Sequence, residues 1–216
     1  MLLLALDTST PAITAALADD RRVLAERTTV DPRRHGELLA PGIADVLARA
    51  GVRCNELTHV IVGVGPGPFT GLRVGLVTAL TLGAALEVPV HGVCSLDVLA
   101  WEAEEPGEFA VATDARRREV YWARYTDRRT RVEGPSVGRP ADVAPVLGAL
   151  PVVGAGALMY PEVLRLGHGP QHPSAAAMAV LASERLTAGE SLLPPRPLYL
   201  RRPDAAEPGL RKPVLR

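Results

Sequence analysis

Hydrophobic and polar positions fall into blocks whose period changes along the first half of the chain. Leu2 to Leu6 is a continuous apolar run that stops at Asp7, which is the pattern of a buried strand opening into a polar turn. Two further apolar segments, 13–18 and 23–29, are separated by a pair of aspartates. The three segments together predict an antiparallel meander.

After the meander the apolar period becomes helical. Between Leu39 and Ala50 the apolar residues recur every three or four positions, and Gly51 follows where a C-cap is expected. Pro41 falls in the first turn of this helix or kinks it. A strand over 58–64, a helix over 69–86, a strand over 88–93 and a helix over 95–102 complete the order βββαβαβα.

A charged, turn-rich stretch at 104–107 predicts a boundary between two units, residues 1–104 and residues 105–216. In the second unit we expect strands at 109–113 and 120–125, a strand starting at Val152, and a helix over 173–186. The tail from Pro194 is rich in proline and arginine, which predicts loop or extended chain with a flexible end.

Composition narrows the class of protein. The chain has 216 residues, 47% of them hydrophobic, and a formal net charge of zero, so it can form a real core and has no global charge to hold nucleic acid or a membrane. Its two cysteines lack C-x-x-C spacing, which favours a reducing, cytoplasmic setting over a disulfide framework. We expect no signal peptide at the first apolar run and no membrane span.

The most distinctive segment is rich in glycine and proline and runs from Gly63 to Gly75, between a predicted strand and a predicted helix. Free N–H groups at such a helix start can receive phosphate or a carboxylate. The alternative is a tight connection that serves packing alone. The glycine spacing does not fit the dinucleotide fingerprint, because Thr70 stands where the final glycine should be.

The helix after this segment carries two ridges. Small residues recur at every fourth position, at Gly71, Gly75, Ala79 and Gly83, and Leu72, Leu76 and Leu80 form the adjacent ridge. A helix that is apolar on most of its surface needs cover on more than one side. One side would be covered by the sheet of its own lobe, and the other by a neighbouring helix or a second protein chain. The alternative is that the helix is fully buried within this one chain.

Three motifs resemble, in order and spacing, the TsaB/YeaZ family. They are Leu4 to Ser9, Gly63 to Gly75, and Asp114-Ala115-Arg116 with Glu119 to Trp122. The sequence around His35 and the segment 197–201 fit the same family. The resemblance runs from the first strand to about Tyr125 and is weak between 126 and 194.

This resemblance implies the α/β actin-like ATPase fold (ASKHA, RNase H-like), with two related lobes, mixed sheets and a reduced second lobe. In catalytic members the turn after the first strand faces phosphate and Mg²⁺. The nucleotide-facing positions here are Asp7, Thr8, Ser9, Gly65 and Gly67. The family pattern implies that they are degenerate, with a structural role as turn and cap formers. We therefore expect no cofactor in this chain, with ATP or ADP entering only at the level of a complex.

We expect neither a metal site nor a catalytic residue. The catalytic relative TsaD carries a His-x-x-x-His pair after the strand equivalent to 88–93, whereas here Ser95 follows His91 at that interval. His168 and His172 have the interval but sit among glycines and prolines, which predicts a loop. The family hairpin motif is Asp114, Ala115, Arg116, Glu119 and Tyr121. Its basic turn either contacts phosphate or an acidic partner, or is a solvated tip.

The resemblance implies a non-catalytic subunit that pairs with and activates TsaD, which threonylcarbamoylates N6 of adenosine 37 in tRNAs reading codons that begin with A. TsaE is the expected third member, tRNA contact is indirect, and a homodimer is expected in isolation. The predicted partner interface lies on the two helices of the first lobe and comprises His35, Leu38, Leu39, Ile43, Thr70, Gly71, Leu72, Arg73, Gly75, Leu76 and Ala79. The alternatives are a small-molecule kinase of the same fold, a metallopeptidase, or a scaffold with another partner.

Overall fold

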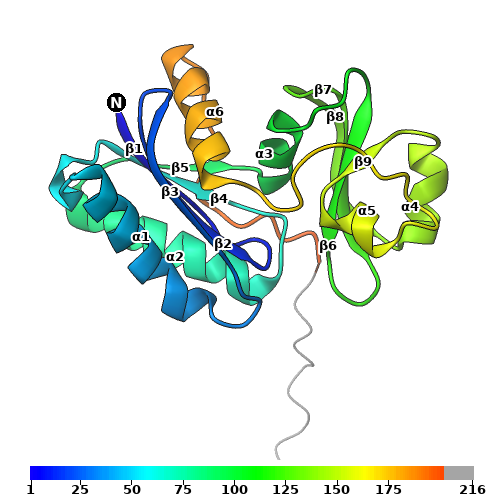
Figure 1. Cartoon of the computed structure of the whole chain (residues 1–216), viewed down its shortest axis with the longest axis horizontal. Coiled ribbons are helices and arrows are strands. Elements are labelled where there is room, and N and C mark those ends of the chain that lie inside the picture. Colours follow the sequence, from blue (N-terminus) through cyan, green and yellow to red (C-terminus); the bar gives the residue numbers. More distant parts are fainter. Residues whose placement is uncertain (202–216) are drawn as a thin grey trace, which may run out of the picture.

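The computed structural model describes residues 1–201 and consists of two lobes that lie side by side (Figure 1). The first lobe is built on a five-stranded sheet in the order β3-β2-β1-β4-β5. Its strands are β1 (Leu2–Asp7), β2 (Ala12–Asp19), β3 (Arg22–Val30), β4 (His59–Gly63) and β5 (Val90–Val93). The last part of the predicted proline- and arginine-rich tail lies outside the described residues.

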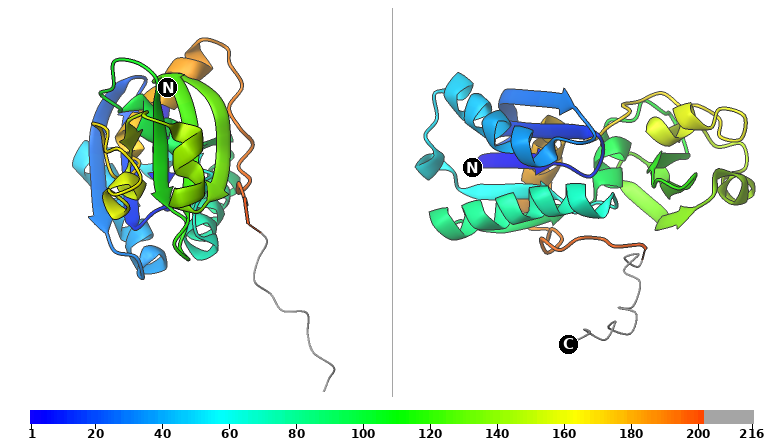
Figure 2. Two further views of the ribbon diagram at one scale, coloured as in Figure 1. Left: turned by 90° about the vertical axis from the view of Figure 1, so that its right-hand side faces the viewer. Right: turned by 90° about the horizontal axis from the view of Figure 1, so that it is seen from below.

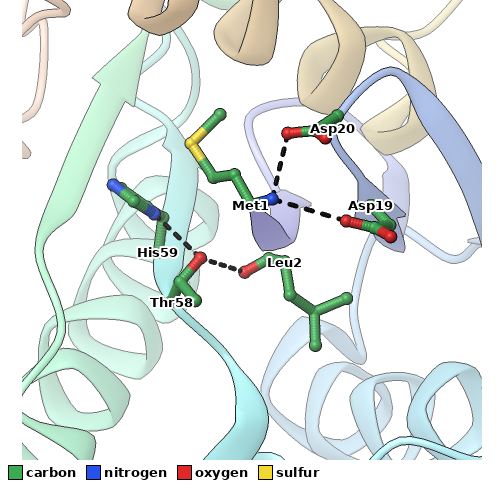
Figure 3. Close-up of polar contacts among 6 residues, drawn as sticks. All are labelled: Met1, Leu2, Asp19, Asp20, Thr58 and His59. Atoms are coloured by element: carbon green, nitrogen blue, oxygen red, sulfur yellow. Dashed lines mark hydrogen bonds and ion pairs between the residues drawn. The ribbon is translucent and has the colours of Figure 1, made fainter.

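The first sheet is mixed, with the apolar strand β1 at its centre. β1 is antiparallel to β2 and parallel to β4. Polar contacts fix the start of this register (Figure 3). The Met1 amino group lies 2.9 Å from a carboxylate oxygen of Asp20, and the Thr58 hydroxyl donates to the Leu2 carbonyl at 2.9 Å. Because the Thr58 proton is used in that bond, Nδ1 of His59 donates to Thr58 Oγ1 at 3.0 Å.

Helices cover both faces of the first sheet. One face packs against α1 (His35–Ala50) and α2 (Phe69–Leu86), and the other packs against α6 (Ala175–Thr187) with part of α3 (Ser95–Trp101). Figure 1 shows α1 and α2 side by side below the sheet, with α6 above it. A short 3-10 helix, η1 (Cys54–Glu56), leads into β4.

The second lobe repeats the topology of the first. Its four-stranded sheet has the order β8-β7-β6-β9, which corresponds to β3-β2-β1-β4. The elements are β6 (Phe109–Asp114), β7 (Val120–Asp127), β8 (Thr130–Gly138), α4 (Pro140–Leu147), β9 (Val152–Val153) and α5 (Ala155–Met159). The predicted fold, two related mixed-sheet lobes of the actin-like ATPase type with a reduced second lobe, is confirmed.

Several details differ from the sequence-based expectations. Helix α1 begins at His35, so Pro41 falls inside it, in the second turn. The elements β8, α4 and α5 were not predicted. Helix α6 belongs to the range 105–216, yet it contacts β1 and β2 of the first sheet. The chain therefore returns to the first lobe, because the face of that sheet opposite α1 and α2 needs an apolar cover.

The segment after α6 also returns to the first lobe and then reaches the second. Leu193 pairs with Gly92 at the edge of β5, and the Leu198 N–H donates to the Val64 carbonyl at 2.9 Å. Arg201 then forms an ion pair with Glu119 of the second lobe. Figure 2 shows this segment running along the same side of the molecule as α2. We call residues 190–201 the strap.

Candidate functional site

The turn after β1 is closed by its own hydrogen bonds. Asp7 is 1% exposed. One of its carboxylate oxygens accepts from the N–H and the hydroxyl of Ser9, both at 2.7 Å, and the other accepts from the Ser95 hydroxyl at 2.6 Å. Burial raises the pKa of Asp7, and the hydrogen bonds from Ser95 and Ser9 oppose that rise.

Two glycines of the 63–75 segment allow the turn after β1 to lie in close contact with that segment. A Cβ on Gly63 would overlap the Asp7 carboxylate, and a Cβ on Gly67 would overlap the Ser9 carbonyl. Gly65 donates its N–H to the Ser95 hydroxyl at 3.2 Å. The Asp7 carboxylate is therefore hydrogen-bonded within the chain, to Ser9 and Ser95.

Thr8 joins the same turn to α2. Its hydroxyl donates to the Gly71 carbonyl at 2.8 Å and accepts from the Gly75 N–H at 3.0 Å. A Cβ on Gly71 would lie 2.5 Å from the Thr8 carbonyl oxygen, and one on Gly75 would lie 2.5 Å from the Thr8 hydroxyl oxygen. Nε2 of His35 donates to the Thr10 carbonyl at 2.8 Å and so anchors the start of α1.

This packing places most of the predicted partner-interface residues in the interior of the first lobe. Gly71 and Gly75, expected to form the contact core, are buried against Thr8 within the chain. Five more predicted interface residues are buried in the first lobe: Leu39, Ile43, Leu72, Leu76 and Ala79. Leu38 and His35 are half-buried, whereas Thr70 and Arg73 are exposed. Gly71 and Gly75 serve the close approach of the Thr8 turn, Gly83 faces Val90 of β5, and all four residues of the ridge are buried.

The exposed face of α2 is a different strip, formed by Phe69, Arg73, Val77 and Leu80. The side chains of Phe69, Val77 and Leu80 are 40%, 60% and 45% exposed. We call these four residues the α2 outer strip. Their spacing of four, four and three positions places them on one side of the helix. Sequence reasoning missed Phe69, Val77 and Leu80 as surface residues because α2 is apolar on most of its surface.

By length and hydropathy, α2 is the one helix within residues 1–201 that could cross a membrane. Its inner side nevertheless packs on β4 and against α1. The apolar side chains of the outer strip are thus an exposed patch on a helix whose other side belongs to the core. Exposed apolar side chains on one side of a surface helix are a candidate surface for interaction with another protein.

The family hairpin motif lies at the junction of the two lobes. The Tyr121 hydroxyl donates to the Gly67 carbonyl at 3.4 Å, and the Asp114 carboxylate pairs with Arg116 at 3.1 Å. Glu119 accepts an ion pair from Arg201 of the strap, which also donates to the Ala115 carbonyl at 3.2 Å. The motif residues are therefore brought together, and they join the second lobe to the start of α2.

The turn of this hairpin is strained. Arg116, Arg117 and Arg118 have φ of 62°, 54° and 59°, three successive non-glycine residues in the left-handed region. Each costs about 1–2 kcal/mol relative to the right-handed conformation. Arg116 and Arg117 border a pocket of about 370 Å³ between the lobes, whose other lining residues are Gly67, Pro68, Phe69, Ala115, Tyr121, Tyr199, Leu200 and Arg201.

The histidines considered as metal ligands do not converge. His168 pairs with Glu105 at 3.4 Å, and His172 lies in the same loop with a lowered pKa caused by burial. Within residues 1–201 no group of three or more potential metal-ligating side chains is present. The loop conformation predicted for both histidines is the one observed.

Comparison with known proteins gives consistent matches. The family model described as TsaD, tRNA N6-adenosine threonylcarbamoyltransferase, matches residues 22–154. An uncharacterized protein of Mycobacterium tuberculosis is 47% identical over 208 residues, covering 94% of this chain and 92% of its own length. The tRNA threonylcarbamoyladenosine biosynthesis protein TsaB of Escherichia coli is 37% identical over 128 residues, covering 58% of this chain and 55% of that protein.

Solved structures agree over nearly the whole chain. YeaZ from Pseudomonas aeruginosa superposes with a TM-score of 0.78 at 33% identity, covering 92% of this chain and 99% of that one. A second Pseudomonas aeruginosa structure, described as similar to peptidase YEAZ, has a TM-score of 0.79 at 32% identity, covering 93% and 99%. Because both structures span both lobes, the weakly matching residues 126–194 share the fold as well.

Proposed function

We propose, because this chain belongs to the TsaB/YeaZ family, that it is a non-catalytic subunit that pairs with a TsaD-type transferase in threonylcarbamoyladenosine synthesis on tRNA. The observation that carries the proposal is the combination of a closed β1 turn with an exposed apolar strip on α2. The first leaves Asp7 engaged in structural hydrogen bonds. The second provides a surface for another protein.

The names of relatives support the same pathway. The Escherichia coli and Bacillus subtilis relatives are named as threonylcarbamoyladenosine biosynthesis proteins TsaB. With a formal net charge of zero, this chain has no net positive charge of the kind that strengthens affinity for nucleic acid. We therefore assign tRNA binding to the TsaD-type partner. A TsaE-type ATPase is the third member of the proposed complex, and the cytoplasm is its proposed location.

A reconstituted reaction tests this function. Threonylcarbamoyladenosine formation is measured with the cognate synthase, TsaD-type and TsaE-type proteins, with and without this chain. The proposal expects modification to depend on the chain while the chain alone turns over no substrate. Equal modification without it contradicts the proposal. ATP hydrolysis by the isolated chain, lost in Asp7→Ala, would favour the kinase alternative.

The surface is tested separately. Val77→Asp and Leu80→Asp each place a charge on the α2 outer strip without disturbing buried residues, and both should weaken pairing with the TsaD-type subunit at least tenfold. The matched control is Val132→Asp, because Val132 is 53% exposed on β8 of the other lobe. In isolation the same strip should form a homodimer, and the same two substitutions should shift it to monomer in sedimentation.

A further inference from the structure

Arg73 forms the outer layer of a three-layer stack at the exposed end of α2, with Phe69 in the middle and Tyr199 beneath it. Its guanidinium carbon lies 3.9 Å from the centre of the Phe69 ring. Phe69 in turn stacks on Tyr199 of the strap, with ring centroids 5.3 Å apart and an angle of 28° between the planes. Phe69 and Tyr199 are 40% and 41% exposed. Tyr199 of the strap thus packs against one face of the Phe69 ring. The other contact of Phe69, a cation–π interaction, orients the Arg73 side chain.

Arg73 has no carboxylate partner among residues 1–201. Helix α2 contains no acidic residue from Phe69 to Leu86, so no neighbour on the same helix can neutralise it. The positive end of the helix dipole lies at the same end of α2 and adds to the local positive potential. The exposed apolar side chains of Val77 and Leu80 lie next to Arg73 on the same side of α2.

Covering such a surface with a purely apolar partner would bury an unpaired charge, which is strongly unfavourable. A partner that packs on Val77 and Leu80 must therefore present a carboxylate to Arg73. Arginine suits this contact because its planar fork can bind a carboxylate in bidentate fashion while one face of the guanidinium stacks on a ring.

We propose that Arg73, held by the Tyr199–Phe69 stack, recognises a carboxylate on the TsaD-type subunit, so that the outer strip selects an apolar partner helix carrying one Asp or Glu. This inference rests on the proposed function and adds the chemistry of the partner to it. It also assigns Tyr199 of the strap a positioning role in the contact.

The α2 helix of a second copy of this chain fits the strip less completely. The acidic residue nearest to the end of α2 is Glu87, the helix C-cap, about 21 Å along the axis from Arg73 at 1.5 Å per residue. A twofold pair would bring Glu87 to Arg73 only in an antiparallel register centred on Leu80. In that register the partner helix ends opposite Arg73, and the Phe69 and Tyr199 rings lie beyond it, uncovered.

The experiment measures the dissociation constant of the full chain with its cognate TsaD-type subunit by calorimetry. Arg73→Glu should weaken pairing at least 30-fold, Arg73→Lys about threefold to tenfold because the stack and the fork are lost, and Tyr199→Ala by a similar amount. Arg22→Glu, an exposed charge reversal on β3, is the matched control for long-range electrostatics and should change pairing less than threefold. Thermal unfolding of each variant checks that it is folded.

The outcomes separate this inference from the proposed function. If Arg73→Glu pairs like the native chain while Val77→Asp does not pair, the proposed role of Arg73 is wrong and the outer strip remains the interaction surface. Unchanged pairing in both variants overturns the surface itself. Loss of the homodimer in both Arg73→Glu and Glu87→Gln, with the heterodimer intact, assigns the cation to a second copy of this chain and contradicts the proposal.

Discussion

Glu102 ends α3 in a half-buried position that disfavours its charged form. Burial, together with the nearby charge of Glu26, raises its pKa to about 7 against the opposing effect of a hydrogen bond from the Ser174 backbone. One carboxylate oxygen is buried with no hydrogen-bond partner. The proton is therefore held in the folded state between about pH 4.5 and pH 7, while the unfolded chain loses it near pH 4.5.

The free energy of unfolding should consequently fall as the pH rises through this window, because ionising a half-buried carboxyl group is unfavourable only in the folded state. Glu102→Gln removes that effect, so the variant should gain stability relative to the native chain between pH 5 and pH 8. The gain should be on the order of 1 kcal/mol after allowance for solvent screening. Urea denaturation at the two pH values measures it. Glu162→Gln, at an exposed site, controls for the loss of one negative charge, and an identical gain in it would contradict the assignment.

At the scale of the element, α2 is placed by the contact between its glycine ridge and the Thr8 turn. Gly75→Ala puts a methyl group 2.5 Å from the Thr8 hydroxyl oxygen and should cost about 1–3 kcal/mol of unfolding free energy. Thr8→Ala removes both the clash and two hydrogen bonds. Because the two sites are in contact, the double variant should lose less stability than the sum of the single changes.

The chain offers a matched glycine for this prediction. A Cβ on Gly36, in the first turn of α1, would meet nothing within 4 Å. Gly36→Ala should be neutral or stabilising by up to about 1 kcal/mol, as helix propensity alone predicts. Thermal unfolding of the four variants provides the comparison. Equal losses in Gly36→Ala and Gly75→Ala, or strictly additive losses for Thr8 and Gly75, would show that the ridge does not pack on this turn.

At the scale of the whole molecule, the lobes are also joined on the side opposite α2. Arg129, in the turn between β7 and β8, lies 2.9 Å from Glu184 of α6 and places its guanidinium carbon 4.2 Å from the centre of the Trp101 ring. Arg21 approaches the same Glu184 only at 3.8 Å, with a side chain 72% exposed. Glu184 thus forms a short ion pair with Arg129 of the second lobe and a longer one with Arg21 of the first.

Arg129→Ala should lower the free energy of unfolding by about 1 kcal/mol, because it removes an ion pair and a cation–π contact together, whereas Arg21→Ala should cost less than about 0.5 kcal/mol. Urea denaturation at low and high salt measures both. Since salt screens the ion pair more than the stacking, part of the Arg129→Ala effect should persist at high salt. A larger effect from Arg21→Ala would contradict this account of how the lobes are joined.

The sequence by itself determined the five strands of the first lobe and its helices α1, α2 and α3, but not that α6 and the strap pack on the same lobe. Its strands and helices were predictable because apolar runs, period changes and caps such as Gly51 are local signals, and the family motifs supplied the arrangement of the lobes. The second lobe was harder to predict between 126 and 153. Strand β8 shows little burial along its length, so it carries no clear alternation, and α4 contains an internal proline.

Only the tertiary structure decided which side of α2 faces solvent and what the β1 turn does. A helix that is apolar on most of its surface gives no clear preferred face by periodicity, and only the contact with Thr8 shows that Gly71 and Gly75 face inward. The same holds for Asp7, whose residue type fits either a metal site or a buried cap. Its role depends on Ser95, 88 positions along the chain, and contacts of that range arise from the packing of elements that sequence patterns describe one at a time.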